Sequence, residues 1–390
     1  MRYMWEVSLH TLSWYITWMG ALVYGIIWVG LVLSWFAIPK SPPRSSTEGP
    51  PISVIIAAHN ELANLKSFAK GWLSQEYEPY ELILVLDRCS DGSLAWLKQH
   101  FPHHPRLTIV EIDSSPNNWS PKKWALSKGI QQAKHEWLAL TDADCYTPPT
   151  WLTTLSQKMS EPNQLILGLG FYRNYPGTLN LVIQFETFYT AFQYIGFANL
   201  GLPYMGVGRN LAYTQSFFYD AGGFQSIAEQ LSGDDDLLVN AAAKALHTTT
   251  CINPAGITHS LPVFTWRDWF RQKLRHISAG KSYNSLSQAI LGLFQLSHLC
   301  FYGGLFVTMI TNFEPYSQIG LYFGRIFLGI STLLLIKNKI HSQKIILGYP
   351  LFDLFIFVYN LLIVPLGLIL KPEWKKNLKH PKIPKKTVNW

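Results

Sequence analysis

The stretch EWLALTDADCY, Glu136 to Tyr146, decides which fold this chain is predicted to adopt. An apolar run from Trp137 to Leu140 predicts a buried strand, and two carboxylates, Asp142 and Asp144, follow it one residue apart. In an extended segment residues i and i+2 project to the same side, so the two carboxylates would share a face and repel each other. Such a pattern indicates either a turn, where Asp is favoured, or a site for a divalent cation, which prefers oxygen ligands.

Upstream of this stretch, apolar runs alternate with helical patterns. The apolar runs lie within residues 52–61, 80–93 and 107–113, and the helical patterns span residues 62–73, 93–100 and 120–133. This alternation predicts an α/β domain with a mostly parallel sheet that is covered on both faces. Ligands bind such sheets beyond the carboxyl ends of the strands. Five carboxylates fall at those ends and predict a binding site there: Glu61, Asp87, Asp91, Asp142 and Asp144.

Long apolar segments flank this domain on both sides. Residues 11–38 contain no charged side chain, and a helix that crosses a membrane needs only about 20 residues. We therefore expect a transmembrane helix within residues 1–40, in preference to a buried helix of a soluble protein. Further membrane segments are expected within residues 286–370, because three stretches there are apolar and long enough to cross: 289–313, 317–336 and 345–370.

The basic residues predict how the chain is oriented. The net charge is +8, and the tail at residues 371–390 holds seven Lys and one Glu. A lysine cluster after a hydrophobic segment indicates attraction to anionic headgroups of the lipid bilayer, and nucleic acid is not expected as a partner. Lys40 and Arg44 follow the first helix, which by the positive-inside rule predicts a cytoplasmic central domain. We expect a multi-pass protein of the plasma (inner) membrane, with a linker at residues 41–51 and a basic cytoplasmic tail.

One membrane segment leaves two possibilities open. A full crossing by residues 345–370 would place the lysine tail outside, against the positive-inside rule. The segment contains polar residues and prolines, which favour a re-entrant hairpin instead: Pro350, Asp353, Asn360 and Pro365. Arg325 lies within another apolar segment and indicates either a polar feature near an acceptor channel or an arginine that snorkels to the interface.

Six motifs, in their order along residues 50–280, resemble those of the membrane-bound family 2 glycosyltransferases: AHNE, LDRCSDGS, PKKWAL, TDADC, SGDDDLL and QKLRH. The resemblance implies a GT-A fold, an α/β nucleotide-sugar-binding domain over residues 52–260 with transmembrane helices on both sides. It implies an enzyme that takes a sugar from a nucleotide-diphosphate donor, with a UDP-sugar as the favoured donor. It also implies Mg²⁺ or Mn²⁺ as the cofactor, because a divalent cation stabilises the leaving diphosphate.

The resemblance assigns roles to the acids of the sheet edge. Asp144 is expected to ligate the metal, with Asp142 beside it. Three acids resemble the residues that hold uracil and ribose: Glu61, Asp87 and Asp91. Leu86 stands where the family has the first of two adjacent acids, so the identity of the base stays open. Lys122 matches a family lysine expected to contact the diphosphate; the alternative is an exposed helix lysine.

The stretch LSGDDDLL carries the candidate general base. The resemblance aligns Asp234 with the family's base, and a one-residue shift makes Asp235 the base instead. A base here would remove the proton of the acceptor hydroxyl as that oxygen attacks the anomeric carbon, which implies inversion. A helix N-terminus, where carboxylates complement the helix dipole, would explain one or two of the three acids without any catalytic role.

Two further segments carry candidate cations. Arg209 lies in a Gly-rich segment, residues 204–224, which resembles the family's acceptor side; a simple turn is the alternative. Gln272 and Arg275 match the family's Gln-x-x-Arg-Trp motif, in which Arg275 would pair with the diphosphate. The motif falls within residues 261–285, an amphipathic stretch rich in Trp and Arg that is expected to lie in the membrane interface. His276 replaces the Trp that packs at the acceptor in polysaccharide synthases.

These patterns favour an inverting glycosyltransferase that adds one sugar to a membrane lipid or isoprenoid acceptor at the cytoplasmic face. A processive polysaccharide synthase is the first alternative, and His276 together with only three C-terminal segments disfavours it. A catalytically silent membrane scaffold that binds nucleotide sugar is the second alternative, and the intact acidic set disfavours that one.

Overall fold

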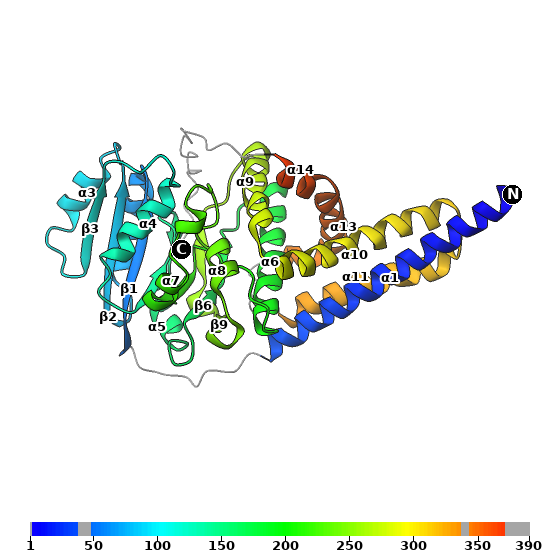
Figure 1. The fold of residues 1–390 in the computed structure, drawn as a ribbon, viewed down its shortest axis with the longest axis horizontal. Helices are drawn as coiled ribbons and strands as arrows, with labels where there is room; N and C mark the ends of the chain where they lie inside the picture. The colour runs from blue at the N-terminus through cyan, green and yellow to red at the C-terminus, as the bar shows by residue number, and fades with distance from the viewer. Residues whose placement is uncertain (1, 38–47, 337–342, 371–390) are drawn as a thin grey trace.

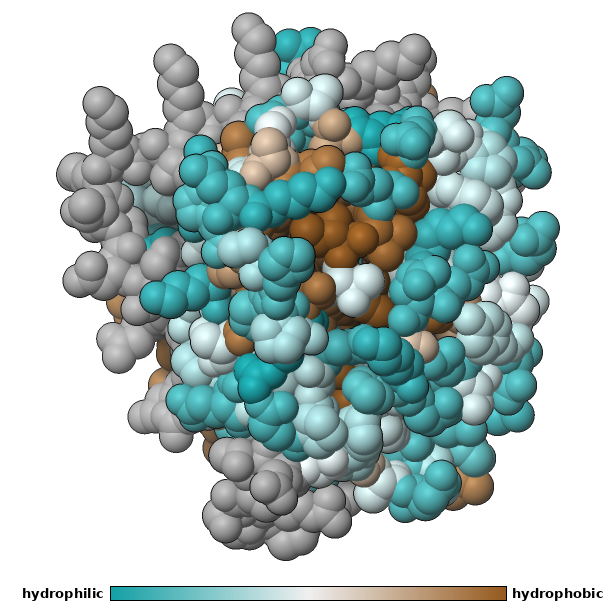
Figure 2. Space-filling view, turned by 90° about the vertical axis from the view of Figure 1, so that its left-hand side faces the viewer, coloured by the Kyte–Doolittle hydropathy of each residue, from teal (hydrophilic) through white to brown (hydrophobic). Residues whose placement is uncertain are grey.

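The computed structural model describes residues 2–37, 48–336 and 343–370, with an α/β part at one end and long helices projecting from the other (Figure 1). Most of the linker expected at residues 41–51, and the whole basic tail expected at 371–390, lie outside the described residues. The face of the α/β part that points away from the long helices is mostly hydrophilic (Figure 2). Water therefore suits this end of the molecule better than a bilayer does.

The α/β part is built on a seven-stranded sheet with the order β3-β2-β1-β4-β8-β6-β9. A second, three-stranded sheet has the order β5-β10-β7. The strands are β1 (Glu48–Ala58), β2 (Glu78–Asp87), β3 (Leu107–Ile112), β4 (Trp137–Leu140), β5 (Cys145–Tyr146), β6 (Leu165–Gly168), β7 (Gly170–Tyr172), β8 (Leu211–Thr214), β9 (Thr248–Cys251) and β10 (Thr258–Ser260).

The four strands predicted from the sequence are mutually parallel, which confirms the predicted mostly parallel α/β sheet. Strand β1 pairs with β2 and with β4, and β2 pairs with β3. Side chains alternate between the two faces, so that Val54 of β1 belongs to one buried cluster and Ile55 to the other. Strand β8 runs antiparallel to both β4 and β6, and the hydrophobic pattern did not predict this reversal.

Helices cover both faces of the sheet. Those of the α/β part are α2 (Leu62–Leu73), α3 (Ser93–His100), α4 (Pro121–Gln131), α5 (Trp151–Ser156), α6 (Thr178–Asn199), α7 (Gln215–Asp220) and α8 (Asp236–Ala242). Helix α6 was not predicted. Most of its residues are buried, because it packs against β7 and β9 on one side and against a long N-terminal helix on the other, so it lacks the polar stripe of a surface helix.

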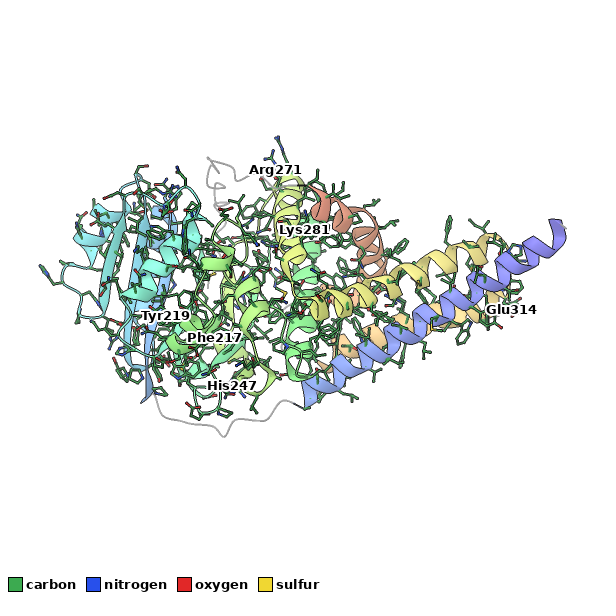
Figure 3. All side chains as sticks on the ribbon, viewed as in Figure 1. Phe217, Tyr219, His247, Arg271, Lys281 and Glu314 are labelled. Carbon is green, nitrogen blue, oxygen red and sulfur yellow. The ribbon has the colours of Figure 1, made fainter. Side chains whose placement is uncertain are left out.

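The long helices at the other end of the molecule are apolar enough to cross a membrane. They are α1 (Arg2–Phe36), α10 (Ser285–Ile310) and α11 (Pro315–Leu335). Among the residues that the structure describes, four helical stretches qualify as spans by length and composition: Leu9–Phe36, Ser285–Ile310, Pro315–Leu335 and Tyr349–Ile369. Helix α10 leads away from the α/β part and α11 returns, so that Glu314 lies at the far end of the molecule (Figure 3). These helices are compatible with a membrane protein.

The last stretch is bent. Residues 349–369 form one continuous helix, composed of α13 (Tyr349–Val358), a π-helical turn (Tyr359–Ile363) and α14 (Val364–Ile369), and preceded by α12 (Gln343–Leu347). The re-entrant hairpin that the sequence left open is not formed by these residues. Helix α14 instead turns towards α9 (Trp266–Ala279) and packs against it (Figure 1). Helix α9 is the core of the amphipathic stretch predicted at residues 261–285, and it is tied to α6 by an ion pair of 2.5 Å between Lys273 and Glu186.

Several polar residues of the apolar helices meet in one buried cluster. Arg325 of α11 donates through Nε and Nη2 to the carboxylate of Asp353 at 2.7 and 3.0 Å, and Nη2 also donates to His298 of α10 at 2.7 Å. The same guanidinium lies 3.6 Å from the ring centroid of Tyr24 of α1, and Tyr189 of α6 hydrogen bonds to His298. Because Arg325 is only 5% exposed, the snorkelling alternative is wrong. The cluster joins five helices through a paired charge.

Candidate active site

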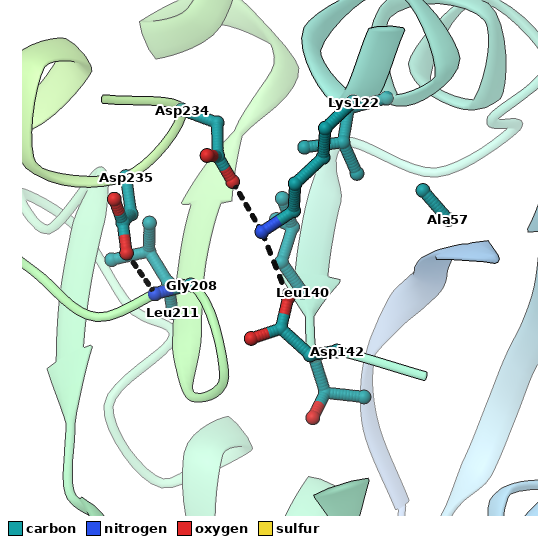
Figure 4. A pocket seen from close by; sticks show the side chains of 10 residues that line it. Ala57, Lys122, Leu140, Asp142, Gly208, Leu211, Asp234 and Asp235 are labelled. Carbon is teal, nitrogen blue, oxygen red and sulfur yellow. Dashed lines mark hydrogen bonds and ion pairs between the residues drawn. The ribbon is translucent and has the colours of Figure 1, made fainter. Parts of the chain in front are cut away.

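A single ammonium group bridges two acids at the carboxyl edge of the sheet. Lys122, in the first turn of α4, places Nζ 2.9 Å from Asp142 Oδ1 and 2.7 Å from Asp234 Oδ2 (Figure 4). Burial opposes the charged lysine, but the nearby carboxylates outweigh it and raise the pKa of Lys122 above its ordinary value. The cleft that these side chains line has a volume of only about 10 Å³. Lys122 is therefore not a plain exposed helix lysine.

Asp142 and Asp144 are brought together by a turn and not by an extended strand. Strand β4 ends at Leu140, and the backbone N–H of Cys145 donates to the carbonyl of Asp142 at 3.0 Å. The geometry assumed from the sequence was thus wrong. The two carboxylates nevertheless converge, since ligand atoms of Asp142, Asp144 and Cys145 all lie within 4.8 Å of one another. The turn and the cation-site interpretations are compatible in this segment.

The chemistry of this donor set fits a hard divalent cation. Burial and the neighbouring charge of Asp142 raise the pKa of Asp144 to about 6, a repulsion that a cation would relieve. The thiol of Cys145 is fully buried and hydrogen bonded to Ser260 Oγ at 3.0 Å, so the two carboxylates are the better candidate ligands. Oxygen ligands of this kind suit Mg²⁺ or Mn²⁺.

Positive charges converge on Asp142 from three elements. Burial raises the pKa of Asp142, but Lys122, Arg209 and Arg275 together hold it below its ordinary value. Arg275 comes from α9, about 130 residues away along the chain, so the fold brings the predicted diphosphate-binding arginine within electrostatic range of the predicted metal site. Side by side, these cations and carboxylates form a site that can hold both a diphosphate and a metal ion.

Arg209 and Gln272 meet at a residue that the sequence did not single out. The guanidinium of Arg209 lies 4.2 Å from the ring centroid of Tyr172, and its Nη2 donates to the tyrosine hydroxyl at 3.3 Å. Gln272 Nε2 donates to the same hydroxyl at 3.2 Å. Nη1 of Arg209 is buried and has no hydrogen-bond partner among the described residues. No local sequence pattern distinguishes Tyr172, because its contact with Gln272 forms only when α9 lies next to β7 in the folded chain.

Three consecutive acids before and within α8 have different environments. Asp234 is 12% exposed and faces Lys122. Asp235 accepts from the backbone N–H of Gly208 at 2.6 Å through one oxygen and from that of Asp236 at 2.8 Å through the other, and it caps α8. Asp236 is buried, and burial together with the charge of Asp235 raises its pKa to about 8. The helix-terminus explanation therefore accounts for Asp235, and the carboxylate of Asp234 is the one directed at Lys122.

A buried lysine holds the loop that carries Asp234. Lys123 is 1% exposed, and its Nζ donates to three backbone carbonyls at 2.7 to 2.8 Å: those of Ile227, Gln230 and Ser232. Lys122 and Lys123 are neighbours on α4, yet one points into the cleft and the other into the protein. Sequence reasoning missed Lys123, because only the position of the facing loop distinguishes the two lysines.

The acids predicted to hold the nucleoside lie at the same sheet edge but outside this cleft. Asp87 is the last residue of β2 and accepts two hydrogen bonds of 2.8 Å from Arg88. Asp91 accepts from the backbone N–H of Leu62 at 2.8 Å, which ties its loop to the start of α2, and Glu61 precedes the same helix. Because β2, β1 and β4 are adjacent, the three acids flank the Asp142 end of the sheet.

Two family models match this chain. The model described as glycosyl transferase family 2 matches residues 53–218, and the model described as glycosyl transferase family group 2 matches residues 137–370, more than half of the chain. The chain therefore belongs to the family 2 glycosyltransferases, enzymes that transfer a sugar from a nucleotide-sugar donor. The family and the enzyme class predicted from the motifs are confirmed.

Individual relatives agree with this class. The probable glycosyltransferase YdaM of Bacillus subtilis is 22% identical over 379 residues, which cover 94% of this chain and 86% of YdaM. A poly-beta-1,6-N-acetyl-D-glucosamine synthase of Staphylococcus epidermidis is 26% identical over 129 residues, covering 30% of this chain and 29% of the synthase. The fold is similar to that of the mannosyltransferase PcManGT from Pyrobaculum calidifontis in complex with GDP-Man and Mn²⁺, with a TM-score of 0.58 and 15% identity over 91% of this chain and 99% of that one. The predicted GT-A fold is thus confirmed.

Proposed function

We propose that this chain is an inverting glycosyltransferase that transfers one sugar from a nucleotide-diphosphate donor to a membrane lipid or isoprenoid acceptor at the cytoplasmic face. The observation that carries the proposal is the bridge from Asp142 through Lys122 to Asp234, with Arg209 and Arg275 in electrostatic range. It supports a candidate metal site, a candidate diphosphate site and a candidate base close to one another, in a chain whose apolar helices are long enough to cross a membrane.

The donor is recognised by charge at its diphosphate. Lys122, Arg209 and Arg275 supply cations for the phosphate oxygens, and the guanidinium forks suit bidentate contacts. Mg²⁺ or Mn²⁺ held by Asp144 and Asp142 would neutralise the diphosphate as it leaves. A cavity of about 10 Å³ holds roughly one water molecule, so Lys122 has to swing away from Asp142 when the donor enters. Its ammonium then becomes free to contact the diphosphate.

Asp234 acts as the general base. Its carboxylate removes the proton from the acceptor hydroxyl while that oxygen attacks the anomeric carbon from the side opposite the diphosphate. Both oxygens of Asp235 are engaged by backbone N–H groups, so this residue fixes the start of α8 and thereby the position of Asp234. Lys123 restrains the same loop from the other side through its bonds to three carbonyls.

An acceptor that arrives from the membrane is favoured by the way α8 is joined to α10. The side chain of Asn240 in α8 accepts from the backbone N–H of Asn284 at 2.6 Å and donates to Ser287 Oγ at 3.0 Å. Asp236 in the first turn of α8 accepts from the hydroxyl of Tyr283 at 2.9 Å. The helix that follows the base is thus hydrogen bonded to the first turn of a candidate membrane span.

The proposal is tested with the full chain reconstituted in nanodiscs that contain a bacterial lipid extract. A panel of radiolabelled UDP- and GDP-sugars is supplied with Mn²⁺, followed by lipid extraction and mass spectrometry. We expect one donor to give a lipid product with a single added sugar, and no product from an Asp144→Ala variant. A polymeric product would favour the processive alternative, and the absence of nucleoside diphosphate release with every donor would favour the scaffold.

A further inference from the structure

A cavity lined mainly by apolar residues lies between the α/β part and the first turns of α10. Its volume is about 140 Å³. It is lined by the end of α6 and the loop after it, by the residues that follow α8, and by one face of α10: Phe197, Gly201, Leu202, Pro203, Tyr204, Ala243, Ala245, Asn284, Leu286, Ser287, Ile290 and Leu291. None of these residues lines the cleft around Lys122.

The wall of the cavity is connected to the candidate base. Tyr204, whose ring lines the cavity, packs edge-on against Tyr283 at a centroid distance of 6.1 Å, and Tyr283 donates to Asp236. Asn240 donates to the carbonyl of Tyr204 at 2.9 Å and to Ser287 Oγ at 3.0 Å. A molecule in this cavity would therefore lie against the residues that directly follow α8, the helix that begins two residues after Asp234.

The cavity continues into the apolar surface of a candidate membrane helix. Leu286 and Ile290 line the cavity and Leu293 follows them on the same face of α10, since residues four and seven apart lie above one another. Leu286 is 60% exposed and Leu293 is 49% exposed. In a bilayer this face would be in contact with lipid chains, so the cavity adjoins a helix face that hydrocarbon chains would cover.

The volume of the cavity and the residues that line it indicate which kind of molecule it can hold. A cavity of about 150 Å³ in a protein accommodates a molecule of the size of benzene, so the volume here is sufficient for a stretch of about five or six carbon atoms. We propose that the cavity holds part of the hydrocarbon chain of the lipid acceptor and so positions its sugar-accepting end near Asp234. The identity of the occupant as the acceptor rests on the proposed function, whereas the occupancy by a hydrocarbon chain does not.

The experiment uses the full chain in nanodiscs doped with a photoreactive probe, hexadecanol that carries a diazirine in its chain. After illumination, labelled peptides are mapped by mass spectrometry. Filling the cavity with Ile290→Trp should lower labelling of residues 201–204 and 243–245 by about tenfold, as expected when burial of about two methylene groups is lost. The matched control is Leu296→Trp: Leu296 is 54% exposed, does not line the cavity and lies about 120° around α10 from Ile290, so the same added ring should leave that labelling unchanged.

A second variant, Ala243→Leu, fills the cavity from the side of α8 and should act like Ile290→Trp. Absence of label at residues 201–204 and 243–245 in the unaltered chain, or labelling that neither filling variant lowers, would overturn the inference. Photolabelling does not require sugar transfer, so this outcome is distinct from a failure of the proposed function. With an active donor and acceptor pair, Ile290→Trp should raise the KM for the lipid about tenfold and leave the KM for the donor unchanged.

Discussion

Replacement of Lys122 by Met should change metal binding and catalysis in opposite directions. In the structure Lys122 Nζ lies 2.9 Å from Asp142 Oδ1, so the ammonium occupies a position at one of the candidate metal ligands. A divalent cation that enters the donor-free protein has to compete with Lys122 for Asp142. Methionine keeps the length and the apolar stem of the side chain but removes the competing charge.

The magnitude follows from the geometry of the pair. At 2.9 Å and an effective dielectric constant of about 20, Coulomb's law gives about 6 kcal/mol. Both side chains keep 35% of their surface exposed, and fully exposed pairs contribute only about 0–1 kcal/mol. A value of about 1.5 kcal/mol lies between these limits and corresponds to roughly tenfold in a dissociation constant. We expect Lys122→Met to bind Mn²⁺ about tenfold more tightly in the absence of donor.

Turnover should fall in the same variant, because the charge that we propose contacts the diphosphate is lost. Removal of one such contact in a transition state typically costs about 10²-fold in kcat. Binding of Mn²⁺ is measured by electron paramagnetic resonance titration in nanodiscs, and turnover by nucleoside diphosphate release. Lys128→Met is the matched control: Lys128 lies on the same helix and over the ring of Trp124, and it should affect neither quantity. Unchanged or weaker Mn²⁺ binding in Lys122→Met would refute the competition.

Three further predictions concern the acids and the membrane cluster. Asp234→Asn should lower kcat by about 10²–10⁴-fold without altering thermal unfolding, whereas Asp235→Ala should lower stability by about 1 kcal/mol through loss of a helix cap and retain more activity; the reverse ranking of kcat would make Asp235 the base. Asp144→Asn should weaken Mn²⁺ binding and lower metal-dependent release by about 10²-fold, with donor-free protein folded as judged by its unfolding temperature; full activity in that variant would remove Asp144 from the metal site. Asp353→Asn should destabilise the detergent-solubilised protein by about 3–5 kcal/mol, because Arg325 is left buried without its counter-charge. The double variant Arg325→Met with Asp353→Leu should recover most of that loss. Equal unfolding temperatures for the unaltered protein and both variants would contradict the structural role of the pair.

The sequence alone determined the features that depend on local patterns. The alternation of apolar runs and helical patterns predicted the four parallel strands, because side-chain periodicity is a property of neighbouring residues. The apolar lengths likewise predicted the helices that are able to cross a membrane. Motif order was sufficient for the family, and it named the charged residues that line the Lys122 cleft, Asp142 and Asp234 among them. The paths of β8 and of residues 349–369 were not predicted, since both depend on what packs around them.

Tertiary structure alone decided which of two neighbouring residues has which role. Asp234 and Asp235 are indistinguishable in the sequence, and they are separated by a backbone N–H from Gly208, 27 positions earlier. Lys122 and Lys123 diverge because the loop at residues 227–232 supplies carbonyls to only one of them. Arg325 is buried rather than snorkelling because Asp353 of another helix meets it. In each case a polar group needs a partner, and only the folded chain determines which distant residue provides it.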